Sequence, residues 1–263
     1  ADSALRQEMF NVIITTFLKK DEKGKRDVRD EILALELLAY NFHDAIDIGP
    51  LFNHVRKNID SEQNAAEKKL PELTKRLERV AKEVTSKQLA SLGDGGAKFD
   101  AWVMFDVLDE NPQKDPIKAL DGVLLAPDSA DRDPAEQDSA DRDPVVEIDT
   151  AVPLRKAYLE VLDYDKIRKT LDVQLTVSNE ESGVTELSVN FEVGFYDFPM
   201  IDNSRLPGGQ RVAVALQDWE AGSHVQLALA YFPGSRASLK EKRFYEEIVK
   251  QLQSVQSPLL SIK

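Results

Sequence analysis

Residues 167–195 read IRKTLDVQLTVSNEESGVTELSVNFEVGF, and this stretch decides the fold class. Apart from Lys169, apolar side chains alternate with polar ones on both sides of a turn at 178–183. Alternation with a period of two is typical of a strand that has one buried face. The apolar positions are Ile167, Leu171, Val173, Leu175 and Val177, then Leu187, Val189, Phe191, Val193 and Phe195. The stretch therefore predicts a long β-hairpin with one face in a core.

Further strand-like segments lie on both sides of this hairpin. Residues 98–108 alternate but are apolar on both faces, with Trp102 and Met104 on the second face. Two apolar faces are typical of a strand at the centre of a sheet. Residues 225–232 show the same pattern, which predicts a second strand covered on both sides. Other strands are expected at 122–126, 154–164 and 211–217, although 154–164 also fits a helix.

The front of the chain is predicted to be helical. Asp27 stands where an N-cap belongs, and apolar residues then recur at helical spacing. Gly93 is expected to end the last of these helices in a left-handed conformation. The expected helices cover 3–20, 28–42, 50–58 and 61–92, the last with an interruption or restart at Pro71.

The order of these elements predicts an α+β protein. An N-terminal helical segment at 1–95 precedes a mainly antiparallel β domain at 96–263. A capping box from Ser238 to Glu241 opens a C-terminal helix over 238–254. The pattern leaves two architectures open for the β domain, a two-sheet sandwich or a helix-backed meander.

Composition excludes several classes of function. The chain has 263 residues and no cysteine, which excludes a disulfide scaffold, a thiol nucleophile and a thiolate metal site. Its formal charge is −13, which argues against a nucleic-acid partner. Residues 1–95 hold 16 basic and 17 acidic side chains, whereas 96–263 hold 18 and 30. The acidity of the rear part indicates either solubility or a docking face for a basic partner.

A near-exact ten-residue repeat fills the segment 127–144. The run Asp-Ser-Ala-Asp-Arg-Asp-Pro begins at Asp128 and again at Asp138. Because it has no apolar side chain larger than alanine, it predicts an exposed acidic loop. Calcium binding is the alternative, but the spacing, glycine and closing glutamate of an EF-hand are missing.

Two segments are candidates for binding a partner. The loop at 196–203 clusters Tyr196, Phe198, Met200 and Ile201, which indicates either a binding lip or a crossover loop folded over the edge of a sheet sandwich. The helical seam at 73–84 is bordered by basic residues that include Arg76 and Arg79. That seam fits an intramolecular helical hairpin or a short coiled coil with another chain.

Candidate catalytic groups are incomplete. His43 and Asp44, with Asp47 and His54 nearby, resemble part of a metal site but fall at a predicted helix end, where the helix dipole favours a charged histidine. The carboxylates Asp106, Asp109 and Glu110 supply a potential acid and base at the end of one strand. Neither set of residues contains all the side chains that a known metal site or catalytic site requires. The sequence therefore assigns no catalytic residue, no metal ligand and no cofactor.

The function that these observations favour is a non-enzymatic interaction or scaffold module whose partner is another protein. A carboxylate- or metal-dependent hydrolase is one alternative. The soluble portion of a membrane-anchored protein is another, with an anchor upstream of Ala1, because the chain holds no apolar run of about 18 residues. A cytoplasmic and a periplasmic location fit equally well, and the sequence does not determine the oligomeric state.

Overall fold

The computed structural model describes residues 27–44, 46–66, 71–93, 95–110, 115–126 and 153–236, together with positions 11 and 15. The chain divides into two compact units, and the division falls inside a helix, after Gln88. We call them the helical unit (1–88, 195–201 and 238–263) and the β unit (89–194 and 202–237). The predicted C-terminal helix, the acidic repeat and, apart from positions 11 and 15, the predicted helix at 3–20 lie outside the described residues.

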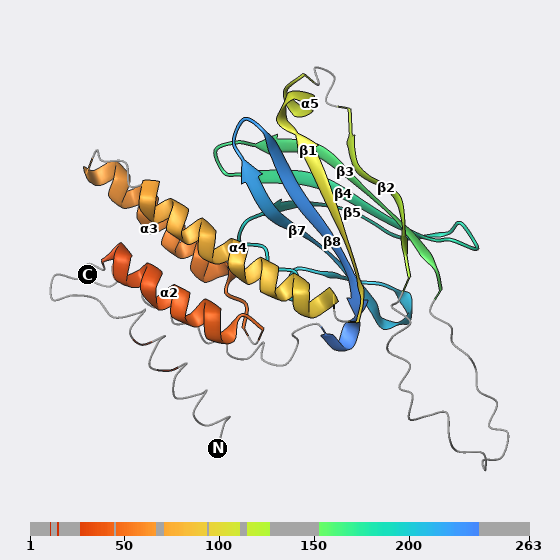
Figure 1. Cartoon of the computed structure of the whole chain (residues 1–263), viewed down its shortest axis with the longest axis horizontal. Coiled ribbons are helices and arrows are strands. Elements are labelled where there is room, and N and C mark those ends of the chain that lie inside the picture. Colours follow the sequence, from red (N-terminus) through yellow and green to blue (C-terminus); the bar gives the residue numbers. More distant parts are fainter. Residues whose placement is uncertain are drawn as a thin grey trace, which may run out of the picture. The chain divides into compact units, whose positions relative to one another are not determined.

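Two antiparallel sheets of four strands form the β unit (Figure 1). Sheet A has the strand order β1-β8-β7-β6, and sheet B has the order β2-β3-β4-β5. The strands are β1 (Ala97–Met104), β2 (Ile117–Leu125), β3 (Arg155–Asp165), β4 (Thr170–Asn179), β5 (Thr185–Gly194), β6 (Ser204–Arg205), β7 (Gln210–Glu220) and β8 (His224–Pro233). The sheets contact each other through β1 with β2 and through β5 with β7, as in a sandwich. This architecture confirms the predicted α+β class.

The predicted hairpin is formed by β4 and β5. Val173 pairs with Phe191 and Leu175 pairs with Val189, which places the apolar alternation on one face. The Asn179 side chain holds the connecting turn by accepting from two backbone N–H groups, and Gly183 supplies a positive φ of 68°. The hairpin starts later than predicted, because Ile167 lies in the preceding turn and is 85% exposed.

The prediction for residues 98–108 was wrong in two respects. Strand β1 ends at Met104, and Phe105–Asp109 form the short helix α5, because the Asp106 carboxylate accepts from the Val107 N–H and ends the extended backbone. β1 also lies at an edge of sheet A and leaves Trp102 56% exposed. In contrast, β8 is buried on both faces, as its pattern predicts.

Three helices are described in the helical unit and its continuation: α2 (Val28–Phe42), α3 (Gly49–Ala66) and α4 (Pro71–Gly93). Asp27 caps α2 by accepting from the Arg29 N–H at 2.8 Å, as predicted. The next two helices were predicted at 50–58 and 61–92. In the structure the first of them, α3, continues to Ala66, and the second, α4, begins only at Pro71. Gly93 ends α4 without the positive φ expected of it. No helix in the described part is long and apolar enough to span a membrane.

Candidate functional site

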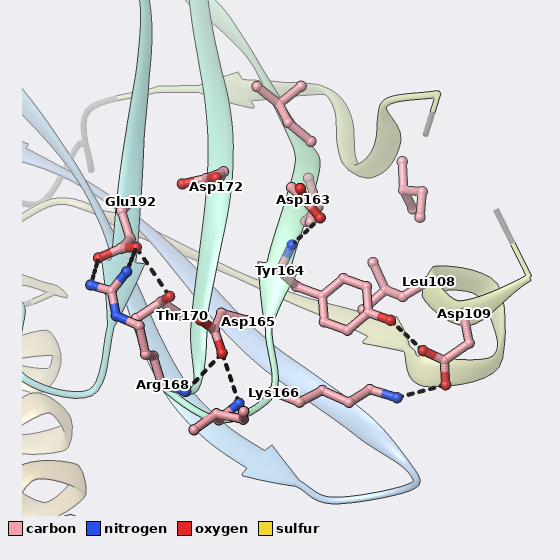
Figure 2. A pocket seen from close by; sticks show the side chains of 14 residues that line it. Leu108, Asp109, Asp163, Tyr164, Asp165, Lys166, Arg168, Thr170, Asp172 and Glu192 are labelled. Atoms are coloured by element: carbon pink, nitrogen blue, oxygen red, sulfur yellow. Dashed lines mark hydrogen bonds and ion pairs between the residues drawn. The ribbon is translucent and has the colours of Figure 1, made fainter. Parts of the chain in front are cut away.

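The β unit contains a pocket of about 710 Å³ at the end of sheet B where β3 turns into β4 (Figure 2). Its walls come from α5, β2, β3, β4, β5 and the turn at 166–169. The apolar part of the lining is Leu108, Ile117, Val161, Leu162 and Ile167. The charged part is Asp109, Asp163, Asp165, Asp172, Glu192, Lys166 and Arg168. Five carboxylates against two cations give the lining a net charge of −3.

The turn between β3 and β4 positions both cations. The Asp165 carboxylate accepts from the backbone N–H groups of Ile167 at 2.8 Å and Arg168 at 2.9 Å. Lys169 then takes a positive φ of 55°, which closes the turn. Figure 2 shows Lys166 and Arg168 leaving this turn towards opposite sides of the pocket.

A row of carboxylates crosses three strands beside this turn. Asp163 of β3 is directly opposite Asp172 of β4, and Asp172 is directly opposite Glu192 of β5. Like charges placed directly opposite each other destabilise a sheet. Arg168 compensates one of them, with hydrogen bonds of 2.9 and 2.7 Å to the two oxygens of Glu192. Within the residues described, the Asp172 carboxylate is exposed and makes no hydrogen bond or ion pair.

The second cation lies on the α5 side of the pocket. Lys166 Nζ is 2.8 Å from Asp109 Oδ2, and the Tyr164 hydroxyl donates to Asp109 Oδ1. The Lys166 hydrogen bond lowers the pKa of Asp109, and Asp109 in return raises the pKa of Lys166. Both groups are therefore charged at neutral pH.

Residues 196–201 of the predicted binding loop belong to the helical unit, and residues 202–203 belong to the β unit. Tyr196 and Phe198 pack on the Phe52 ring of α3, with ring centroids 5.4 and 5.3 Å apart. Phe198 and Met200 are buried, whereas Tyr196 and Ile201 are half-buried. Burial raises the pKa of Tyr196 to about 12. A role of these residues in binding a partner stays a prediction, and so does a crossover over the edge of the sandwich; the contacts described here are with α3.

The two predicted arginines pair with acidic side chains of the same unit. Arg76 donates to both oxygens of Glu36 on α2, at 2.7 and 2.5 Å. Arg79 lies 3.6 Å from Glu36 and 3.9 Å from Glu83. The apolar seam that they border is buried at Leu77, Val80 and Val84. This arrangement supports the intramolecular interpretation of the seam.

The histidines and aspartates at 43–54, which resembled part of a metal site, make separate local contacts. His43 forms the C-cap of α2, Asp47 accepts from the Gly49 N–H at 3.1 Å, and His54 lies 3.1 Å from Asn58 on α3. Burial lowers the pKa of His43, so it is neutral at pH 7 and does not make the charge–dipole interaction expected at a helix end. In the described ranges no three His, Asp or Glu side chains are placed to hold a metal ion.

We expect the stability of the helical unit to fall in mild acid because of His43. Its folded pKa lies below the ordinary value of 6.5, so the unfolded chain binds the proton first. The neutral form therefore contributes stability above pH 6.5, and this contribution is lost as the pH falls. The melting temperature of the parent should drop more between about pH 7.5 and about pH 5.5 than that of His43→Gln. His224→Gln, in the β unit, is the control; an equal drop in all three proteins would contradict the assignment.

The carboxylates near α5 make separate local contacts. Asp106 lies in the first turn of α5 and accepts from the Val107 N–H, Asp109 is held ionised by Lys166, and Glu110 follows the helix in an exposed position. A general acid at neutral pH needs a raised pKa, whereas the pKa of Asp109 is lowered. A role of these carboxylates in hydrolysis stays a prediction.

Comparisons with known proteins do not identify a family. No protein-family model and no curated protein matches the chain. Among solved structures, a cytochrome c heme lyase CcmF gives a match with a TM-score of 0.22 and 8% identity. The match covers 96% of this chain and 34% of that one, so this chain spans about a third of that protein's length. A TM-score this low supports no statement on fold or function.

Proposed function

We propose that this chain is a non-enzymatic protein-interaction module whose acidic pocket receives a basic segment of a partner protein. The observation that carries the proposal is the charge balance of the lining. Each of the two cations already has its own carboxylate partner, Lys166 with Asp109 and Arg168 with Glu192. The remaining charge is negative, and Asp172 offers its exposed carboxylate to an incoming cation.

The size and lining of the pocket support this proposal. Its volume of about 710 Å³ lies within the range of about 300–1,000 Å³ that ligand pockets have. Lysine and arginine side chains combine an apolar stem with a charged end. The apolar walls at Leu108, Ile117 and Leu162 suit such stems, while the carboxylates suit the charged ends. The acidity of the whole chain adds long-range attraction for a basic segment.

Asp172→Asn should weaken the binding of a basic peptide about two- to fivefold, which is the value of one exposed ion pair. The measurement is fluorescence anisotropy with a labelled peptide of alternating lysine and glycine. Because both partners are exposed, affinity for the parent chain should also fall between about 50 mM and about 300 mM NaCl.

Glu181→Gln is the matched control for this experiment. It removes the same charge from the turn at the far end of the β4–β5 hairpin, roughly 20 Å along the strand from Asp172. The proposal requires that Asp172→Asn weaken binding more than Glu181→Gln does. Equal losses would reduce the effect to net charge, and no peptide binding by the parent chain would contradict the proposal.

A further inference from the structure

Lys166 occupies an ammonium site that its own chain provides. Its Nζ lies 5.4 Å from the ring centroid of Phe105, 5.5 Å from that of Tyr164, and 2.8 Å from Asp109 Oδ2. Two ring faces and one carboxylate are the elements with which proteins recognise alkylammonium groups. The other described cation–π contacts, Lys82 over Phe195 and Lys87 over Tyr40, involve one ring each.

The Lys166 side chain is held weakly, whereas the two rings and the carboxylate around its ammonium group are fixed by other contacts. The Lys166 side chain is 51% exposed and extends from a surface turn, and exposed ion pairs of this kind contribute little free energy. Phe105 is buried and packs against Trp219, with ring centroids 5.1 Å apart. The Tyr164 hydroxyl is fixed by its hydrogen bond to Asp109. Removing Lys166 would therefore leave the rings and the carboxylate in place.

The Asp109 carboxylate divides its oxygens between two donors. Oδ1 accepts from the Tyr164 hydroxyl, and Oδ2 accepts from Lys166. One carboxylate oxygen and two aromatic rings satisfy a compact ammonium group, so the site is matched to the end of a lysine side chain.

We propose that the pocket contains an alkylammonium site and that Lys166 is a tethered occupant which a lysine of the partner displaces. This inference rests on the proposed function and names the ligand chemistry. The apolar lining at Leu108 and Ile117, next to the site, would take the stem of the incoming lysine.

The test is an NMR titration of the full chain with n-butylammonium chloride. Lys166→Ala should bind this probe about two- to fivefold more tightly than the parent, the range expected for vacating an exposed cation–π site. The shifted signals should include the ring protons of Phe105 and Tyr164. n-Butanol, which has the same alkyl chain but no charge, should not show this gain. Lys156→Ala is the control, because it removes a lysine that pairs with Glu180 at 2.8 Å elsewhere on β3.

Two results would overturn the inference. One is a Lys166→Ala variant that binds n-butylammonium no more tightly than Lys156→Ala does. The other is a double variant, Lys166→Ala with Asp109→Asn, that keeps the full gain. Tryptophan fluorescence of each variant checks that the β unit stays folded, since both tryptophans of the chain, Trp102 and Trp219, belong to it. If Lys166→Ala does not bind n-butylammonium more tightly while basic-peptide binding still depends on Asp172, this inference alone fails. If Lys166→Ala does bind n-butylammonium more tightly but the parent chain binds no basic peptide, the proposed function is contradicted instead.

Discussion

Replacing Arg155 with alanine should destabilise the β unit by about 3–5 kcal/mol, the cost of breaking a buried ion pair. Arg155 is fully buried and links the two sheets, since it extends from β3 and its Nη1 donates to the Tyr231 hydroxyl of β8 at 3.1 Å. Its Nε donates to Glu186 at 2.5 Å, and its Nη2 donates to the Pro207 carbonyl at 2.7 Å. The alanine variant leaves the Glu186 charge, whose side chain is 12% exposed, without its cation.

Guanidinium unfolding followed by tryptophan fluorescence measures this effect in the β unit. Arg168→Ala is the matched control, because it breaks an Arg–Glu pair in the same sheet whose side chains are 62% and 40% exposed. Its cost should stay within about 1 kcal/mol. Combining Arg155→Met with Glu186→Leu should recover much of the lost stability, since an apolar pair avoids the desolvation of two charges. Equal costs for the two alanine variants would show that Arg155 does not hold the sandwich together.

Strand patterns were predictable where one face is buried over a long run. The β4–β5 hairpin follows from alternation alone, because a one-residue slip would expose Val173 and Leu175. The ends of elements were less predictable. Ile167 continues the alternation but lies in a turn, and Phe105 continues that of β1 but begins α5. In both places an aspartate side chain bonds the nearby backbone and ends the strand pattern.

The acidic pocket was not predictable from local pattern. Four of its five carboxylates lie on three strands and meet only through the register of those strands, while Asp109 comes from α5. A bulge between Val161 and Asp163 also changes the face on which Asp163 lies. Without that bulge, Asp163 would share the inner face with Val161 instead of standing opposite Asp172. Asp109 was a candidate from the sequence, but its partners Tyr164 and Lys166 come from a different strand and turn.

The packing of the aromatic loop at 196–201 in the helical unit was likewise not predictable from local sequence pattern. Clustered aromatic side chains at the end of a strand fit either an exposed lip or a packed crossover. The distinction depends on contacts with distant residues, here the Phe52 ring on α3 and the Gln88 side chain on α4. Gln88 accepts from the Met200 N–H at 3.1 Å and donates to the His43 carbonyl at 2.5 Å, so it joins the loop to the end of α2.

Phe52→Ala should therefore destabilise the helical unit by about 3–5 kcal/mol, as expected for removing a large buried ring. Phe52 is fully buried, and it stacks on Tyr196 while contacting Phe198 at a tilt of 57°. The measurement is thermal or denaturant unfolding followed by far-ultraviolet circular dichroism at the helical band.

Leu33→Ala provides the control for this loss, because Leu33 lies on α2 and is 49% exposed. Its cost should stay within about 0.5 kcal/mol, as for most surface substitutions. Phe52→Leu should fall between the two, since leucine keeps apolar volume but removes the ring contacts. A loop that served as a free lip would release Phe52 from both aromatic partners, and Phe52→Ala would then cost no more than Leu33→Ala. A loss near the upper value would instead show that the loop is part of the helical core in solution.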